Sequence, residues 1–151
     1  MLVKSLEDIL KEFGAQLGLN LAFDENGVCR LELEQLVAVD IHARQDDGTL
    51  TLSAVVREEL PDPMNYSTVL DLLALALDPA RRGGNSPVVG RDDESGFVVM
   101  YEVATPSMLN RKPLAEIFSE FMKTYGAVSA MLDNQEALAA KERDGAAAAG
   151  E

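Results

Sequence analysis

STVLDLLALALD, the stretch from Ser67 to Asp78, decides how this chain is organised. At 100° per residue its apolar side chains surround the predicted helix, and only Asp71 and Asp78 define a polar sector. A helix that is apolar nearly all round must be buried on more than one side, and a chain of this size is expected to lack a second layer of its own. Leaving three of the leucines in water would forgo roughly 5–8 kcal/mol, at ~1.5–3 kcal/mol each, which is comparable to the stability of a whole small domain. We therefore expect a second copy or a partner to provide the second cover.

The composition limits the class of protein. The chain has 151 residues, of which 47% are hydrophobic and 26% charged, and this suits one domain with its own core. Its 13 Lys and Arg against 26 Asp and Glu give a formal net charge of −13, which repels phosphate backbones and anionic lipid and favours either basic partners or solubility alone. Nucleic-acid binding is not expected.

The N-terminus and the single cysteine bear on location. The start of the chain lacks the apolar core of a signal peptide, and no run reaches the ~18 apolar residues of a membrane span. Cys29 alone cannot form an internal disulfide, which agrees with a reducing compartment. We expect a cytoplasmic protein without membrane insertion.

The N-terminal third predicts a helix followed by a sheet. Apolar residues recur at helical spacing over residues 5–17, where Ser5 is a suitable N-cap and Gly18 a suitable stop. After Leu19 the pattern alternates, and turn residues such as Asn26-Gly27 separate the alternating runs. This indicates an antiparallel sheet built from hairpins.

The second half predicts another hairpin and a third helix. Residues 97–103 are apolar on both faces, with Val99 and Tyr101 on one and Val98 and Met100 on the other, which suggests cover from both sides. Pro113 suits the first turn of a third helix, whose apolar stripe is formed by Leu114, Ile117, Phe118, Phe121, Met122, Tyr125, Val128 and Leu132.

The order α-β-β-β-α-β-β-α predicts an α+β fold, a mainly antiparallel twisted sheet of about five strands with three helices. We expect one domain over residues 1–132. Residues 133–151 are Ala-rich and are expected to form a disordered C-terminal tail, after at most a brief prolongation of the third helix.

No residue pattern points to catalysis or to a metal. His42, the only histidine, falls on the same side of its strand as Asp40 and Arg44, as a solvated residue would. Cys29 lies in an alternating apolar run and is expected to be a buried thiol rather than a nucleophile. The acidic turns lack the donor spacing of a calcium loop, and the Arg81–Gly84 turn lacks the Lys-Ser of a phosphate loop. We therefore expect no enzyme, no cofactor and no metal site.

Short motifs spread along the chain carry a resemblance to a known family. In order they are Leu17-Gly18, Phe23-Asp24, Cys29-Arg30-Leu31-Glu32-Leu33, Leu50-Thr51-Leu52, Leu60-Pro61, the Leu70/Leu73/Leu77 helix, Gly83-Gly84, and Gly96 before Phe97-Val98-Val99-Met100-Tyr101-Glu102. With the small size and the acidity, they resemble the class I chaperones of bacterial type III secretion systems, the Tir-chaperone-like family, over roughly Leu2 to Leu132. Many members carry Leu-Ser-Leu after the Gly-Gly loop, where this chain has Pro87-Val88-Val89-Gly90.

The resemblance implies a function in virulence. A homodimer would bind the N-terminal segment of one or a few secreted effector proteins, keep it extended, soluble and secretion-competent, and use neither ATP nor a cofactor. The very apolar helix and the second hairpin would form the dimer contact, and the effector would insert side chains into grooves of the first helix and the sheet. We predict a dimer interface of Leu70, Leu73, Leu77 and Met100, and an effector groove of Leu6, Ile9, Phe13, Leu33 and Val56.

Two alternatives remain open at this point. The same dimer would serve a regulatory binding protein that sequesters a transcriptional or secretion regulator. A small-molecule enzyme on this fold would require a deep polar pocket. The apolar stripe of the first helix either closes the core or lines a binding groove, and different residues of one helix can do both.

Overall fold

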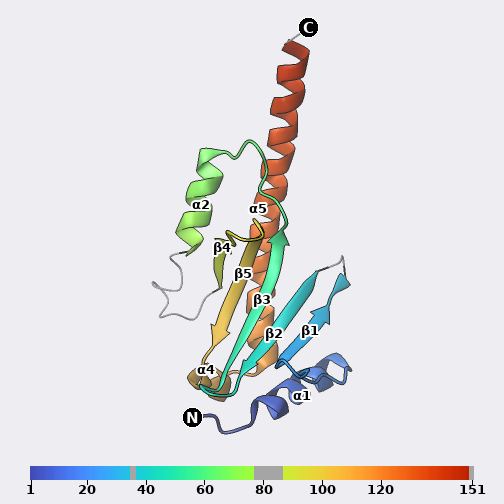
Figure 1. Cartoon of the computed structure of the whole chain (residues 1–151), viewed down its shortest axis with the longest axis vertical. Helices are drawn as coiled ribbons and strands as arrows, with labels where there is room; N and C mark the ends of the chain where they lie inside the picture. The colour runs from blue at the N-terminus through green and yellow to red at the C-terminus, as the bar shows by residue number, and fades with distance from the viewer. Residues whose placement is uncertain (35–36, 77–86, 150–151) are drawn as a thin grey trace.

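Over the residues that the structure describes, the helices and strands follow the predicted order, with one additional short helix. This computed structural model describes residues 1–34, 37–76 and 87–149. The elements, shown in Figure 1, are α1 (Leu6–Leu17), β1 (Val28–Glu32), β2 (Ala38–Arg44), β3 (Thr49–Arg57), α2 (Tyr66–Ala76), β4 (Val88–Arg91), β5 (Val98–Ala104), α4 (Pro106–Arg111) and α5 (Leu114–Ala149). The α+β class and the five-stranded antiparallel sheet are confirmed. The added helix is α4, which Thr105 caps and in which Pro106 occupies the first turn.

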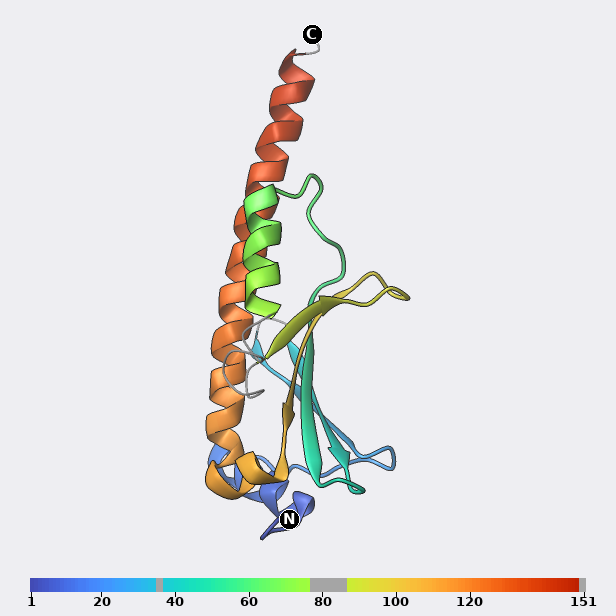
Figure 2. The ribbon, with the colours of Figure 1, turned by 90° about the vertical axis from the view of Figure 1, so that its left-hand side faces the viewer.

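The helices lie on one face of the sheet. Neighbouring strands run antiparallel in the spatial order β1-β2-β3-β5-β4, so β1 and β4 are the edges. Figure 2 shows α2 and α5 on one side of the sheet and, among the described residues, no helix against the other side. Side chains alternate between the two faces, and the core forms between the sheet and the helices.

Helix α1 begins and ends where the sequence predicts. The Ser5 hydroxyl accepts a hydrogen bond from the backbone N–H of Asp8 at 3.1 Å, and Gly18 adopts a φ of 71° after the last turn. The apolar face of α1 is buried, and the Phe13 ring lies 5.1 Å from the Phe118 ring of α5, centroid to centroid. The stripe of α1 therefore closes the core.

Helix α5 extends beyond the predicted domain boundary. Its apolar stripe from Leu114 to Leu132 packs on the sheet as predicted, with Ile117 and Phe121 fully buried. The helix then continues to Ala149, through the segment expected to be a disordered tail (Figure 1). Ala, Gln, Glu, Lys and Leu favour helix in this segment, and tertiary contacts add to that tendency. The division of the chain into two parts at residue 132 stays a prediction.

One carboxyl group interrupts the apolar core. Glu102 lies between Met100 and Ala104 on the helix-facing side of β5, and it is 2% exposed. Among the described residues its Oε2 atom has no hydrogen-bond partner. Burial, followed by the Glu120 carboxylate, raises the pKa of Glu102 to about 7 against the opposing effect of Lys112. The folded chain therefore holds a proton here that the unfolded chain loses.

We expect Glu102→Gln to remove a pH-dependent loss of stability. The folded carboxyl keeps its proton up to about pH 7, whereas the unfolded one ionises near its ordinary pKa of 4.5, so the free energy of unfolding falls as the pH rises through this window. At pH 8 the variant should be more stable than the natural chain by about 1–3 kcal/mol, and at pH 5 the two should differ little. Urea unfolding at both pH values measures this, and parallel pH profiles of the two chains would contradict it.

Candidate functional site

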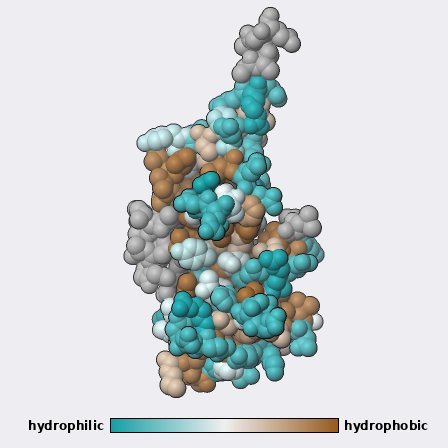
Figure 3. Space-filling model, viewed as in Figure 1, coloured by the Kyte–Doolittle hydropathy of each residue, from teal (hydrophilic) through white to brown (hydrophobic). Residues whose placement is uncertain are grey.

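An exposed apolar stripe runs along α2. Its members recur at helical spacing, and their exposed fractions range from 36% to 76%. This α2 stripe consists of Tyr66, Val69, Leu70 and Leu73. Figure 3 shows a brown area over α2, on the surface that faces the viewer. On the opposite side of the helix, Leu72 packs against the core and Thr68 hydrogen-bonds to α5, so the chain covers α2 on that side itself.

The residues predicted for the dimer interface divide into three groups. Leu70 and Leu73 lie on the α2 stripe, and Leu77 lies outside the described residues. Met100 is fully buried, because it occupies a helix-facing position of β5. A second copy would reach Met100 only if this packing opened.

The uncovered face of the sheet carries a second apolar area. Val55 of β3 and Tyr101 and Val103 of β5 are each about two-fifths exposed there, at 43%, 42% and 39%. The register places Val99 opposite Val55 and Val88 of β4 opposite Tyr101, so this open-face patch continues over three strands. None of these residues belongs to a site predicted from the sequence. The signal that could have found them is the pair of apolar faces predicted for residues 97–103.

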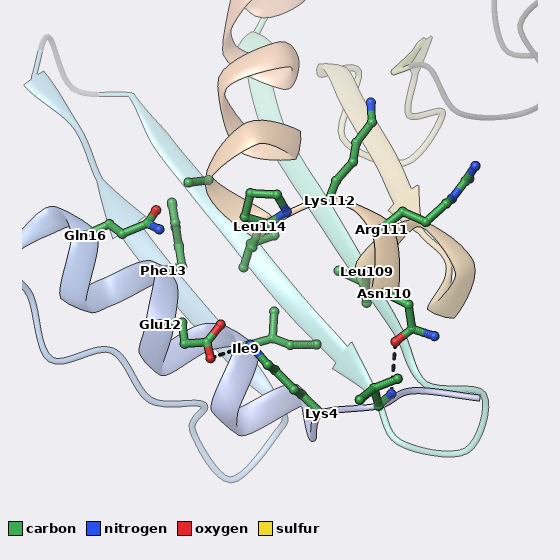
Figure 4. A pocket seen from close by; sticks show the side chains of 13 residues that line it. Lys4, Ile9, Glu12, Phe13, Gln16, Leu109, Asn110, Arg111, Lys112 and Leu114 are labelled. Carbon is green, nitrogen blue, oxygen red and sulfur yellow. Dashed lines mark hydrogen bonds and ion pairs between the residues drawn. The ribbon is translucent and has the colours of Figure 1, made fainter.

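A pocket opens between α1 and the junction of α4 with α5 (Figure 4). Ile9 and Phe13, both predicted for the effector groove, line it together with Leu114. On its rim the Lys4 ammonium group donates a hydrogen bond to Glu12 at 2.7 Å. Ile9 and Phe13 are only 7% and 3% exposed, so only a small part of each side chain is accessible from this hollow, which we call the α1 pocket.

The other predicted groove residues lie away from the α1 pocket. Leu33 is half-buried and lines a groove between the end of β1 and α5, together with Val37 and Met122. Val56 is 4% exposed beside the bulge of β3 and borders a different pocket, and Leu6 is 2% exposed in the core. The structure therefore brings Ile9 and Phe13 to one pocket, with Leu6 one turn earlier on the same buried face of α1, and it places Leu33 and Val56 at other hollows.

A guanidinium group fixes the α5 wall of the Leu33 groove. Arg57 donates to the carbonyl oxygens of Val56 at 2.8 Å and Ser129 at 3.1 Å, and it pairs with the carboxylates of Asp133 and Glu136. The Arg57 side chain is 20% exposed, but Asp133 and Glu136 are 63% and 50% exposed, so water screens the ion pairs and the hydrogen bonds to the two carbonyl oxygens carry most of the attachment. The end of β3 and α5 are thus held together on the edge of the groove.

The groups with potential reactivity lie where the sequence predicts. His42 is exposed on β2, and Cys29 is 5% exposed on β1, where burial raises the pKa of its thiol. The described residues contain no group of His, Cys, Asp and Glu side chains suited to a metal ion. None of the described helices combines the length and hydrophobicity needed to cross a membrane.

The two exposed apolar areas define the class of protein. Contiguous exposed apolar surface marks sites of protein interaction, so this is an α+β domain that binds other protein chains. The chain belongs to the Tir chaperone protein (CesT) family, because the model of that family matches residues 8–128. The resemblance recognised in the sequence is confirmed. A search of curated proteins finds no match to this chain.

Solved structures share the fold over most of this chain. The HopA1–SchA chaperone–effector complex matches with a TM-score of 0.66 and 21% identity, over 81% of this chain and 91% of that chain. The ExsC–ExsE complex matches with a TM-score of 0.66 and 19% identity, over 85% and 97%. The heterodimeric ExoU–SpcU complex of the type III secretion system from Pseudomonas aeruginosa matches with a TM-score of 0.61 and 16% identity, over 85% and 98%. At these identities the likeness shows the fold.

We expect Phe13→Ala to lower the free energy of unfolding by about 3–5 kcal/mol, because it removes a core ring that packs on Phe118. Leu17→Ala provides the control, since Leu17 is 46% exposed at the end of the same helix and its truncation should cost less than about 1 kcal/mol. Chemical denaturation of both variants measures the difference. Equally small losses would show that Phe13 is not a core residue.

Proposed function

We propose that this chain is a type III secretion chaperone that works as a homodimer in the cytoplasm. It holds the N-terminal segment of one or a few effector proteins extended, soluble and secretion-competent, and it uses no ATP. The observation that carries this proposal is the α2 stripe, an apolar surface left uncovered by a chain of a chaperone family. The HopA1–SchA structure, which shares this fold, is a chaperone–effector complex, and this supports the proposal.

A second copy of the chain is the proposed cover of the α2 stripe. In a two-fold dimer the same apolar surface serves both subunits. Burying one large apolar side chain contributes roughly 1.5–3 kcal/mol. Tyr66, Leu70 and Leu73 from both copies therefore supply a gain of the size needed to offset an association cost of roughly 4–15 kcal/mol.

The effector segment is proposed to follow the β1 edge and the grooves near it. An edge strand offers main-chain groups to an added strand, and β1 is one edge of this sheet. The Leu33 groove lies at the end of β1, and the α1 pocket lies under Ile9 and Phe13. Apolar side chains of the effector would enter these hollows, while the net charge of −13 favours a segment that carries basic residues.

We expect Leu73→Asp to abolish the dimer while the subunit stays folded. The change places a charge at a position that is 60% exposed in one subunit and buried between two. Light scattering after size exclusion measures the mass, and circular dichroism reports folding. Leu17→Asp is the matched control, because Leu17 is also an exposed leucine but lies on α1, away from α2. A stable dimer of the Leu73 variant would contradict the proposed interface.

The effector proposal is tested by co-expression with the product of the neighbouring reading frame. Chaperones of this kind are often encoded beside their client. We expect the two chains to purify together without ATP, and protease treatment should leave a resistant fragment from the N-terminal part of the client, identified by mass spectrometry. Capture of a fully folded partner with no protected N-terminal fragment would favour the regulatory alternative and overturn the chaperone proposal.

A further inference from the structure

The part of α5 beyond the predicted domain packs against α2. Gln135 and Ala139 lie one turn apart on this part of the helix, and they are 3% and 1% exposed. Figures 1 and 2 both show α2 alongside the middle of α5, whose C-terminal turns extend beyond it. We call residues 133–143 the α5 extension. Its buried face is too well covered for a segment without a structural role.

A buried amide at the centre of this contact holds two parts of the chain. The Gln135 Nε2 group donates to the Pro63 carbonyl oxygen at 2.8 Å, and its Oε1 atom accepts from the Thr68 hydroxyl at 3.0 Å. One side chain therefore fixes both the segment that enters α2 and the first turns of α2. Farther along the α5 extension, Arg143 donates to the Asp62 carbonyl oxygen.

The same turns of α5 are attached to the sheet on another side. Arg57, at the end of β3, contacts Ser129, Asp133 and Glu136. Gln135 lies on the neighbouring side of these turns, toward α2. The α5 extension thus connects the end of β3 to α2, and the position of α2 relative to the sheet depends on it.

The contact with Gln135 lies on the reverse of the exposed stripe. Thr68 and Leu70 are two residues apart, which separates them by about 200° around the helix axis. The face of α2 that meets α5 is therefore roughly opposite to the face that carries Tyr66, Leu70 and Leu73. Contacts on one face set the direction in which the other face points.

We infer that the α5 extension is an internal support that presents the α2 stripe to a second copy of the chain, and that Gln135 is its positioning residue. This inference rests on the proposed homodimer and assigns a role to a segment outside the family match, which ends at residue 128. Losing the Gln135 bonds leaves the Pro63 carbonyl and the Thr68 hydroxyl without these partners. The loss of these two hydrogen bonds should make α2 more mobile and leave the strands unchanged.

The test uses Gln135→Leu in the full chain, with amide hydrogen exchange and sedimentation equilibrium as readouts. We expect exchange of the amides in residues 69–74 to become at least tenfold faster, and the dimer dissociation constant to rise at least tenfold. Amides of β3 and β5 should exchange at the natural rate. Glu142→Leu is the matched control, because it introduces the same side chain at an exposed position of the same helix, and it should change neither quantity.

Thr68→Val provides a second variant that keeps the core volume. It removes only the hydroxyl that Gln135 accepts from, so α2 exchange should rise in the same direction by a smaller factor, and this variant decides the question if Gln135→Leu fails to fold. Exchange in α2 equal to that of the Glu142→Leu control would overturn the inference. If the natural chain proves to be a monomer, the homodimer is excluded, and with it the presentation of α2 to a second copy. The exchange rates of the α2 amides would still show whether Gln135 positions this helix.

Discussion

The structure depends on a helix with two apolar sides, of which its own chain covers one. The inner side of α2 meets α5 through Thr68 and Gln135, and Leu72 packs on the core. The outer side carries Tyr66, Leu70 and Leu73 in contact with water. An intramolecular cover loses no translational freedom, so it is in place at every concentration, whereas cover of the outer side follows mass action. The proposed assembly would therefore follow from how α2 divides its apolar surface.

The sheet repeats this asymmetry. Its helix-facing side is filled by apolar residues, with Glu102 as the buried exception, while none of the described helices lies against the other side. On that side the β1–β2 half carries the pair Arg30 and Asp40, joined at 2.8 Å. The β3–β5 half carries the exposed apolar residues Val55, Tyr101 and Val103 beside the hydroxyl residues Thr51 and Ser53. Exposed apolar surface of this kind promotes aggregation, and the net charge of −13 opposes it by mutual repulsion.

The sequence predicted local structure well because local chemistry decides it. Ser5 and Gly18 mark both ends of α1, and alternation located the strands. The sequence could not show whether Leu6, Phe13 and Val56 belong to the core or to a binding groove, because periodicity tells which side of an element is apolar but not what covers that side. The cap of α4 at Thr105 and Pro106 is readable in the sequence, but a proline at this point also predicts a simple strand end. Composition beyond Leu132 favoured disorder after a brief continuation of the helix, and it could not indicate the contacts of Gln135, which are made with residues about seventy positions away.

Those distant contacts bear on how a small chaperone reaches useful affinity. Association is favoured when the interacting surface is ordered beforehand, because less conformational entropy is then lost on binding. A helix as short as α2 is only marginally stable in isolation, so an α2 that was held by its partner alone would have to order during assembly. Gln135 and Arg57 join α2, α5 and β3 within one subunit, so the stripe would already be oriented before the proposed second copy binds. We infer that the long α5 fixes the orientation of α2 within the subunit, so that the exposed side of α2 can remain apolar.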